Sequence, residues 1–151
     1  APEPVALSPI LEKIRSEFEA KETGARAAIH IQEGLPPVTG VRTFVSQVFT
    51  NLMDNALKYR REGAPPRVEI TGALEGEWAV LSVADNGLGI APEHQEKIFN
   101  IFQRLHGRER YSGTGVGLAI VKKAVELMGG SVALESQPGQ GSTFRVRLPA
   151  G

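Results

Sequence analysis

Residues 67–90 read RVEITGALEGEWAVLSVADNGLGI, and they carry the clearest secondary-structure pattern in the sequence. Two runs with the apolar and β-branched composition of strands, about 67–73 and 77–84, are separated by a Glu-Gly pair typical of a tight turn, so they predict an antiparallel hairpin. Asp85 ends the second run. No third strand follows at once, because Pro92 is typical of the first turn of a helix. The stretch therefore predicts an apolar strand with a carboxylate at its end.

The rest of the chain adds helices and strands to this hairpin. The hydrophobic pattern predicts long helices at about 8–22, 41–60 and 115–128, a short helix at about 92–102, and strands at about 27–32, 131–136 and 142–148. Because the strands arrive mostly as hairpins with long helices between them, the pattern favours an α/β (α+β) two-layer sandwich: a mixed, mostly antiparallel sheet of about five strands with three main helices on one face. Residues 1–7 are expected to be a linker stub, and residues 8–151 one domain.

Composition excludes several classes of function. The chain has 151 residues, of which 41% are hydrophobic and 23% charged, a globular balance. Lys plus Arg and Asp plus Glu both number 17, and a net charge of zero argues against a dedicated binder of nucleic acid or anionic membranes. The absence of cysteine removes thiolate zinc sites and cysteine nucleophiles, and the three histidines lack metalloprotease spacing. With no membrane-spanning apolar run and no signal peptide pattern, a cytoplasmic location is expected.

Three polar residues of the second long helix form a candidate site. Spacings of four and three place Asn51, Asn55 and Lys58 on one stripe of that helix, at the border of its apolar face. An amide oxygen is a suitable ligand for Mg²⁺, and a lysine one turn further can reach a phosphate. The stripe taken alone is also explained by a solvated helix edge, so both readings stay open.

Two further stretches carry polar or glycine-rich chemistry. Asp85 at a buried strand end can accept a hydrogen bond from an exocyclic amine such as that of adenine, although an ordinary Asn-Gly turn is an alternative reading. Residues 113–118, GTGVGL, lead into an apolar helix, whose free backbone N–H groups favour an anion. A dinucleotide fingerprint is disfavoured because Leu118 stands where glycine is needed, and no Gly-Lys-Ser or Gly-Lys-Thr of a P-loop follows.

The order and spacing of five stretches resemble the catalytic, ATP-binding domain of sensor histidine kinases. The matching stretches are NLMDNALKY at 51–59 (the N box), DNGLGI at 85–90 (G1), IFNIF at 98–102 (F), GTGVGL at 113–118 (G2) and GQGSTF at 139–144 (the last glycine box). The resemblance covers about residues 8–148. It implies the Bergerat fold shared with gyrase, the large heat-shock chaperones and MutL-type repair proteins.

The resemblance implies ATP and Mg²⁺ as ligands and assigns roles to residues. Asn55 would ligate Mg²⁺ and Asn51 would support the metal or the phosphates. Lys58 would contact phosphate, Tyr59 would lie against the adenine, and Asp85 would bind the adenine amine. An ATP lid is expected at about 103–114. The remaining expected nucleotide contacts are Gly87, Gly89, Ile90, Phe102, Arg104, Arg108, Arg110, Gly113, Thr114, Gly115, Val116, Gly117, Leu118 and Thr143.

One position bears on the reaction. ATPase members of the superfamily usually carry glutamate four residues before the metal-binding asparagine, as the general base for water. Asn51 stands there and cannot take a proton, so phosphoryl transfer is favoured over hydrolysis. The catalytic group would be Asn51, Asn55 and Lys58.

The expected partner follows from the same resemblance. The expected acceptor is a histidine on separate dimerisation helices of the same kinase, with a response regulator served indirectly. The first helix carries no histidine, so the chain is expected to be a monomeric catalytic domain without its acceptor. Three alternatives stay open: an ATPase of the same superfamily (GHKL, named for gyrase, the heat-shock chaperones, histidine kinases and MutL), an anti-sigma-type serine kinase, and a regulatory nucleotide-binding module.

Overall fold

A computed structural model describes residues 2–21, 28–58, 66–87, 117–137 and 141–151. The helices are α1 (Leu7–Lys21), α2 (Arg42–Lys58) and α4 (Gly117–Leu127). The strands are β1 (Glu3–Val5), β2 (Ala28–Ile31), β3 (Val38–Gly40), β4 (Arg67–Glu75), β5 (Trp78–Asp85), β6 (Ser131–Gln137) and β7 (Gly141–Pro149). The short helix predicted at 92–102 and the lid predicted at 103–114 lie outside the described residues.

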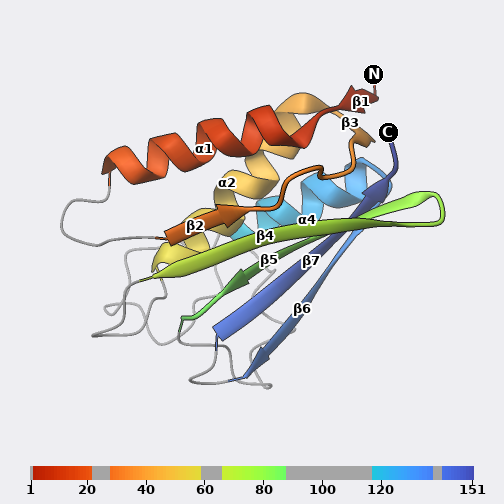
Figure 1. The fold of residues 1–151 in the computed structure, drawn as a ribbon. Coiled ribbons are helices and arrows are strands. Elements are labelled where there is room, and N and C mark those ends of the chain that lie inside the picture. Colours follow the sequence, from red (N-terminus) through yellow and green to blue (C-terminus); the bar gives the residue numbers. More distant parts are fainter. Residues whose placement is uncertain (1, 22–27, 59–65, 88–116, 138–140) are drawn as a thin grey trace.

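The main sheet has five strands in the order β2-β4-β5-β7-β6. The edge strand β2 runs parallel to β4, and the other neighbours are antiparallel. Figure 1 shows the three helices together on one face of this sheet. The predicted two-layer sandwich, with its mixed and mostly antiparallel sheet, is therefore confirmed.

The predicted hairpin is present as β4 and β5. Its turn contains Gly76, which has a positive φ of 63°. Pairing continues over the full length of β5, from Glu75 opposite Trp78 to Val68 opposite Asp85. On the other side of β5, Asp85 is the partner of Ser142, the second residue of β7. The register therefore brings the end of β5 beside the start of β7.

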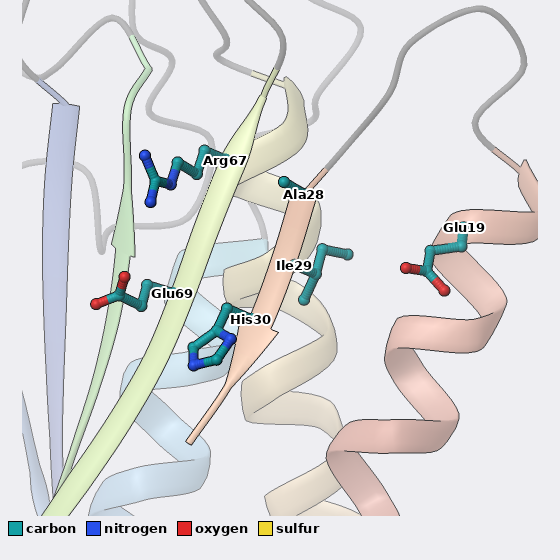
Figure 2. Close-up of a pocket in the computed structure, with 6 residues that line it drawn as sticks. All are labelled: Glu19, Ala28, Ile29, His30, Arg67 and Glu69. Carbon is teal, nitrogen blue, oxygen red and sulfur yellow. The ribbon is translucent and has the colours of Figure 1, made fainter. Parts of the chain in front are cut away.

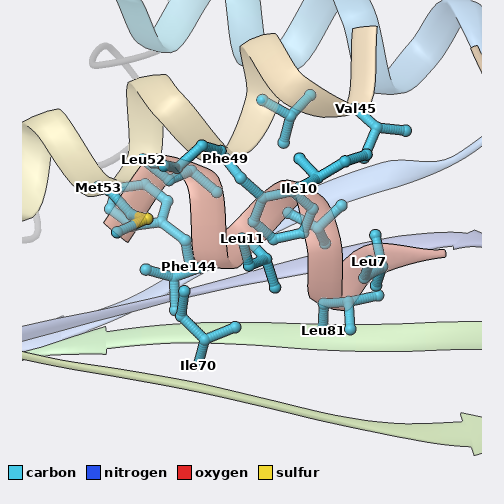
Figure 3. Packing of buried hydrophobic residues seen from close by; sticks show 14 of the residues in the cluster. Leu7, Ile10, Leu11, Val45, Phe49, Leu52, Met53, Ile70, Leu81 and Phe144 are labelled. Carbon is cyan, nitrogen blue, oxygen red and sulfur yellow. The ribbon is translucent and has the colours of Figure 1, made fainter. Parts of the chain in front are cut away.

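The core lies between the helices and the sheet. Strands β5 and β7, and β4 over residues 67–70, alternate buried and more exposed residues, as the period of two requires. Figure 3 shows side chains of α1 and α2 meeting Ile70, Leu81 and Phe144 of the sheet. Burying each side chain of this size contributes about 1.5–3 kcal/mol. This layer holds α2 and α4, which also pack on each other, against the sheet.

Helix α4 ends where the sequence predicts. Gly129 has a φ of 83°, and the backbone N–H of Gly130 donates to the carbonyl of Val125 at 2.9 Å. This is a glycine C-terminal cap, which satisfies carbonyls that the helix leaves without partners. The cap turns the chain directly into β6.

The linker stub expected at residues 1–7 is wrong for residues 3–7. Residues 3–5 form β1, which pairs antiparallel with β3, and α1 already begins at Leu7. Val5 is 0% and Leu7 1% exposed. The physical reason is that β3 offers an edge on which two apolar side chains at the start of the chain can be buried.

The small β1-β3 sheet also joins the two ends of the chain. Val38 of β3 forms an isolated bridge with Ala150, and the N–H of Gly151 donates to the carbonyl of Pro37 at 2.9 Å. Both termini lie at the opposite end of the domain from the C-terminal end of α2 (Figure 1). Within the described part of the chain, no helix is both long and apolar enough to cross a membrane.

Candidate functional site

The carboxyl group of Asp85, the last residue of β5, is held by two backbone donors. The N–H of Gly87 donates to Oδ1 at 2.8 Å, and the N–H of Ser142 donates to the same oxygen at 3.3 Å. Burial raises the pKa of Asp85 from 3.8 to about 6, although the two backbone hydrogen bonds lower it. Among the described residues, both of these donors use Oδ1, which leaves Oδ2 for a further donor.

Two serines extend this polar group along the end of the sheet. Ser142 is 6% exposed and is the buried polar side chain of the described residues. Its hydroxyl lies 2.8 Å from the hydroxyl of Ser136 on β6, and the Ser136 hydroxyl also donates to the carbonyl of Gly141 at 2.9 Å. Since Ser142 is the register partner of both Asp85 and Ser136, the three side chains form one row across three neighbouring strands. We call Asp85, Ser142 and Ser136 the polar row.

Gly141 allows the start of β7 to approach the end of β5. Its φ is +96°, and a Cβ built on it would lie 2.0 Å from the carbonyl oxygen of Asp85. A Cβ atom at that distance is sterically impossible without moving backbone. The last glycine box therefore has a structural role here: it brings β7 close enough for the Ser142 N–H to reach the Asp85 carboxylate.

Asn86, the residue after Asp85, is held by two hydrogen bonds to Arg67. Its side-chain oxygen accepts a hydrogen bond from the Arg67 N–H at 2.8 Å, and its own N–H donates to the Arg67 carbonyl at 3.3 Å. The asparagine thus ties the end of β5 to the start of β4. Sequence reasoning assigned this residue no role, because the contact depends on strand pairing and not on local pattern.

The asparagine stripe of α2 lies at the border of the core, as predicted. Asn51 and Asn55 are half-buried, while Leu52 and Ala56 of the same helix are buried. The Asn51 side-chain nitrogen donates to the carbonyl of Gln47, one turn back, at 2.7 Å. Lys58 is the last residue of α2. The stripe therefore runs to the C-terminal end of this helix.

The predicted elements converge at one end of the domain. Figure 1 shows the C-terminal ends of α2 and β5 and the N-terminal ends of α4 and β7 toward the same end. Gly117 is the first residue of α4, and Leu118 is buried in the core. The structure thus brings together the parts of the N, G1, G2 and last glycine boxes that it describes.

The structure does not bring Thr143 to Asp85. Thr143 is the partner of Ala84, and it lies on the other face of the sheet from the polar row because neighbouring residues of a strand alternate between faces. Ser142 takes the place beside the carboxyl group, and sequence reasoning missed it. The sequence contains a signal for it, because residues two apart in a strand share a face and Phe144 lies on the buried face. Ser142, two residues earlier, therefore lies on that face as well.

Most of the other expected nucleotide contacts cannot be placed. The residues that lie outside the described part of the chain are Tyr59, Gly89, Ile90, Phe102, Arg104, Arg108, Arg110, Gly113, Thr114, Gly115 and Val116. Their contacts stay predictions, and so does the lid assigned to residues 103–114.

A hollow at the β2 edge of the sheet is separate from this site. Figure 2 shows His30 and Glu69, which are register partners, with Arg67 two residues along β4 and Glu19 on α1. His30, Arg67, Glu69 and Glu19 are all exposed. None of these residues belongs to the five matching stretches, so the hollow does not change where the candidate site lies.

Comparison with known proteins identifies the family. A model of the histidine kinase-, DNA gyrase B- and HSP90-like ATPases matches residues 40–151. The chain is 44% identical over 146 residues to cyanobacterial phytochrome A of a Nostoc species, covering 97% of this chain and 18% of that protein. It is 34% identical over 148 residues to the methanogenesis regulatory histidine kinase FilI of Methanothrix harundinacea, covering 98% of this chain and 16% of that protein. The chain thus spans less than a fifth of these relatives.

Solved structures agree with this assignment. The mycobacterial sensor histidine kinase MprB matches with a TM-score of 0.80 and 25% identity, covering 99% of this chain and 98% of that one. Full-length ShkA in complex with AMPPNP matches with a TM-score of 0.80 and 30% identity, covering 100% of this chain and 31% of that one. The chain therefore belongs to the histidine kinase-, DNA gyrase B- and HSP90-like ATPase family, as a catalytic domain of the sensor histidine kinase type.

Proposed function

We propose that this domain binds ATP with Mg²⁺ and donates the γ-phosphate to a histidine on separate dimerisation helices, which then serve a response regulator. The observation that carries the nucleotide assignment is the half-buried carboxyl group of Asp85, with Oδ1 held by two backbone donors. A carboxylate in such a place needs a donor for its second oxygen, because a buried charge without partners is costly. The exocyclic amine of adenine is such a donor.

The α2 stripe fits the phosphate end of the same ligand. Mg²⁺ prefers oxygen ligands and usually takes few from the protein, keeping waters and substrate phosphates. The half-buried Asn55 offers one neutral amide oxygen, which suits that role. When bound, the ion would neutralise phosphate charge, while Lys58 at the helix end would add a point charge. Asn55 and Lys58 then orient the γ-phosphate for in-line attack by the acceptor imidazole, with ADP as the leaving group.

Asn51 supports transfer over hydrolysis. It occupies the position of the general base in the ATPase branch, but an amide cannot take a proton from water. Its nitrogen is also engaged by the Gln47 carbonyl of its own helix. Water is therefore not activated at this position, and the γ-phosphate would be kept for a protein acceptor. An ATPase would instead need a base elsewhere in the site.

Transfer of labelled phosphate tests the proposal. The chain is mixed with γ-labelled MgATP and a histidine-bearing dimerisation domain of a related sensor kinase. Acid-labile label on that domain is the expected result, and its loss on replacing the acceptor histidine is the control. Steady release of inorganic phosphate by the chain alone would support the ATPase alternative. Acid-stable label on a partner serine would support the serine kinase.

Replacing Asn55 with alanine is expected to remove the Mg²⁺ dependence of nucleotide binding. Wild-type affinity for AMPPNP should rise severalfold when Mg²⁺ replaces EDTA, because the Asn55 amide oxygen would hold the ion and the ion would neutralise phosphate charge. Isothermal titration calorimetry in both buffers measures the ratio. Thr50→Ala, an exposed neighbour on the same helix, is the matched control and should keep the wild-type ratio. A persisting ratio in Asn55→Ala would assign the metal to another ligand.

Nucleotide affinity is expected to fall as the pH drops below about 6. The pKa of Asp85 is raised to about 6, so the carboxyl group becomes protonated in the unliganded domain well above its usual range. Protonation weakens it as an acceptor for the adenine amine, and the affinity should change by up to about tenfold per pH unit there. The stability of the unliganded domain changes in the opposite sense: the folded state holds this proton more tightly than the unfolded state, so Asp85 subtracts stability as the pH rises from about 4 to about 6.

Phosphate groups of the nucleotide also titrate near this pH, so the measurement is made as a comparison. AMPPNP binding is followed from pH 5 to 7.5 in the wild-type chain and in Asp85→Asn, which has no carboxyl group at this position. The wild-type slope should exceed the variant slope, and equal slopes would remove Asp85 from the pH dependence.

A further inference from the structure

The proposed function gives a role to Asp85 but none to the two serine hydroxyls of the polar row. Asp85, Ser142 and Ser136 are partners across β5, β7 and β6, and their side chains share the helix-covered face of the sheet. Ser142 is buried between the other two. Whatever group lies next to Asp85 on this face therefore also lies close to the Ser142 hydroxyl.

The direction of each hydrogen in the row follows from counting donors. A serine hydroxyl has one hydrogen, and a carbonyl oxygen can only accept. Ser136 Oγ donates its hydrogen to the Gly141 carbonyl at 2.9 Å. With that hydrogen on the Gly141 carbonyl, we assign the hydrogen of the 2.8 Å contact between the two hydroxyls to Ser142. Ser142 Oγ is thereby left with lone pairs only, as a fixed acceptor.

We propose that Ser136 makes this site select adenine over guanine by holding the Ser142 hydroxyl as an acceptor beside Asp85. The inference rests on the proposed function. In the pose with position 6 of the purine toward Asp85, adenine presents an amine with two hydrogens, which suits two neighbouring acceptors. Guanine presents an oxygen, which two acceptors repel. Ser136 acts through Ser142 and touches no ligand, so it is a positioning residue.

The selectivity therefore depends on a residue of the edge strand. Without the Ser136 oxygen, the Ser142 hydroxyl loses its acceptor and can rotate to donate toward a 6-oxo group. The site would then tolerate guanine, while adenine would still be bound through Asp85. A purely structural role for Ser136 predicts something different, namely an equal loss of affinity for both purines.

The test compares AMPPNP with GMPPNP, using calorimetry on the full 151-residue chain. The ratio of the two dissociation constants is measured in the wild type, in Ser136→Ala and in Ser136→Thr, which keeps the hydroxyl and suits a strand. We expect the preference for AMPPNP to fall about tenfold in Ser136→Ala, the effect of one misdirected hydrogen bond. Ser136→Thr should retain the wild-type preference.

The outcomes separate the role of Ser136 from the proposed nucleotide binding. A Ser136→Ala chain that binds AMPPNP with the wild-type ratio overturns the role of Ser136 and leaves the proposed function standing. A wild-type chain that binds neither analogue overturns the proposed function itself. If Ser136→Ala does not fold, neutron diffraction from deuterium-exchanged wild-type crystals decides. Deuterium on Ser142 Oγ directed at Ser136 supports the proposal, and deuterium on Ser136 Oγ directed at Ser142 refutes it.

Discussion

Replacing Asp85 with asparagine is expected to weaken AMPPNP binding by about 10- to 100-fold. The reason lies in the two backbone donors. The N–H groups of Gly87 and Ser142 both reach Oδ1, so the amide oxygen of asparagine takes that position and the NH₂ group replaces Oδ2. A donor then faces the adenine amine, another donor. Loss of a buried polar contact of this kind costs about 1–3 kcal/mol, or about 5- to 150-fold in affinity, a range that brackets the expected loss.

The variant separates recognition from folding. Asparagine has the shape of aspartate, and it removes a carboxyl group whose ionisation burial disfavours. The unliganded variant should therefore unfold at a temperature no lower than the wild type at pH 7, as followed by circular dichroism. Glu69→Gln, the same chemical change at an exposed position of β4, is the matched control and should bind as the wild type does. Undiminished AMPPNP binding by Asp85→Asn would exclude this carboxyl group from the site.

The parts of the fold that could be predicted are those that leave a pattern in the local sequence. The strand composition of residues 67–84, with its Glu-Gly turn, and the apolar faces of the long helices are local signals. The structure therefore has these elements within a few residues of their predicted ends. Strands β1 and β3 were missed because each has three residues and the stability of the pair comes from contacts far apart in sequence. The same holds for the parallel pairing of β2 with β4, which no local signal specifies.

The residues of the site also divide into those with a local sequence signal and those that depend on which strands are neighbours. Asp85 was found because a carboxylate at the end of an apolar strand is unusual in itself. Ser136 was not, because its partners depend on β6, β7 and β5 being neighbours. Thr143 was chosen from the glycine box by motif, whereas the strand face, which decides what lies beside Asp85, favours Ser142.

Replacing Gly141 with alanine is expected to lower the free energy of unfolding by about 3 kcal/mol and to weaken AMPPNP binding. Two costs combine. The φ of +96° is one that L side chains rarely adopt, and the new Cβ would lie 2.0 Å from the Asp85 carbonyl oxygen. That neighbour is backbone and cannot move to another rotamer, so the start of β7 must separate from β5. The Ser142 N–H then leaves Oδ1 of Asp85. Urea denaturation and calorimetry measure the two effects.

Gly76→Ala isolates the first of these costs. Gly76 also has a positive φ, +63°, but a Cβ added there would meet nothing within 4 Å. Its substitution should therefore cost only about 1 kcal/mol, the strain of the left-handed conformation, and should leave nucleotide binding unchanged. The excess loss in Gly141→Ala measures the close approach of β7 to β5. Equal losses in the two variants would show that the glycine is needed for its backbone angle alone, and the link between strand packing and the Asp85 carboxylate would then fail.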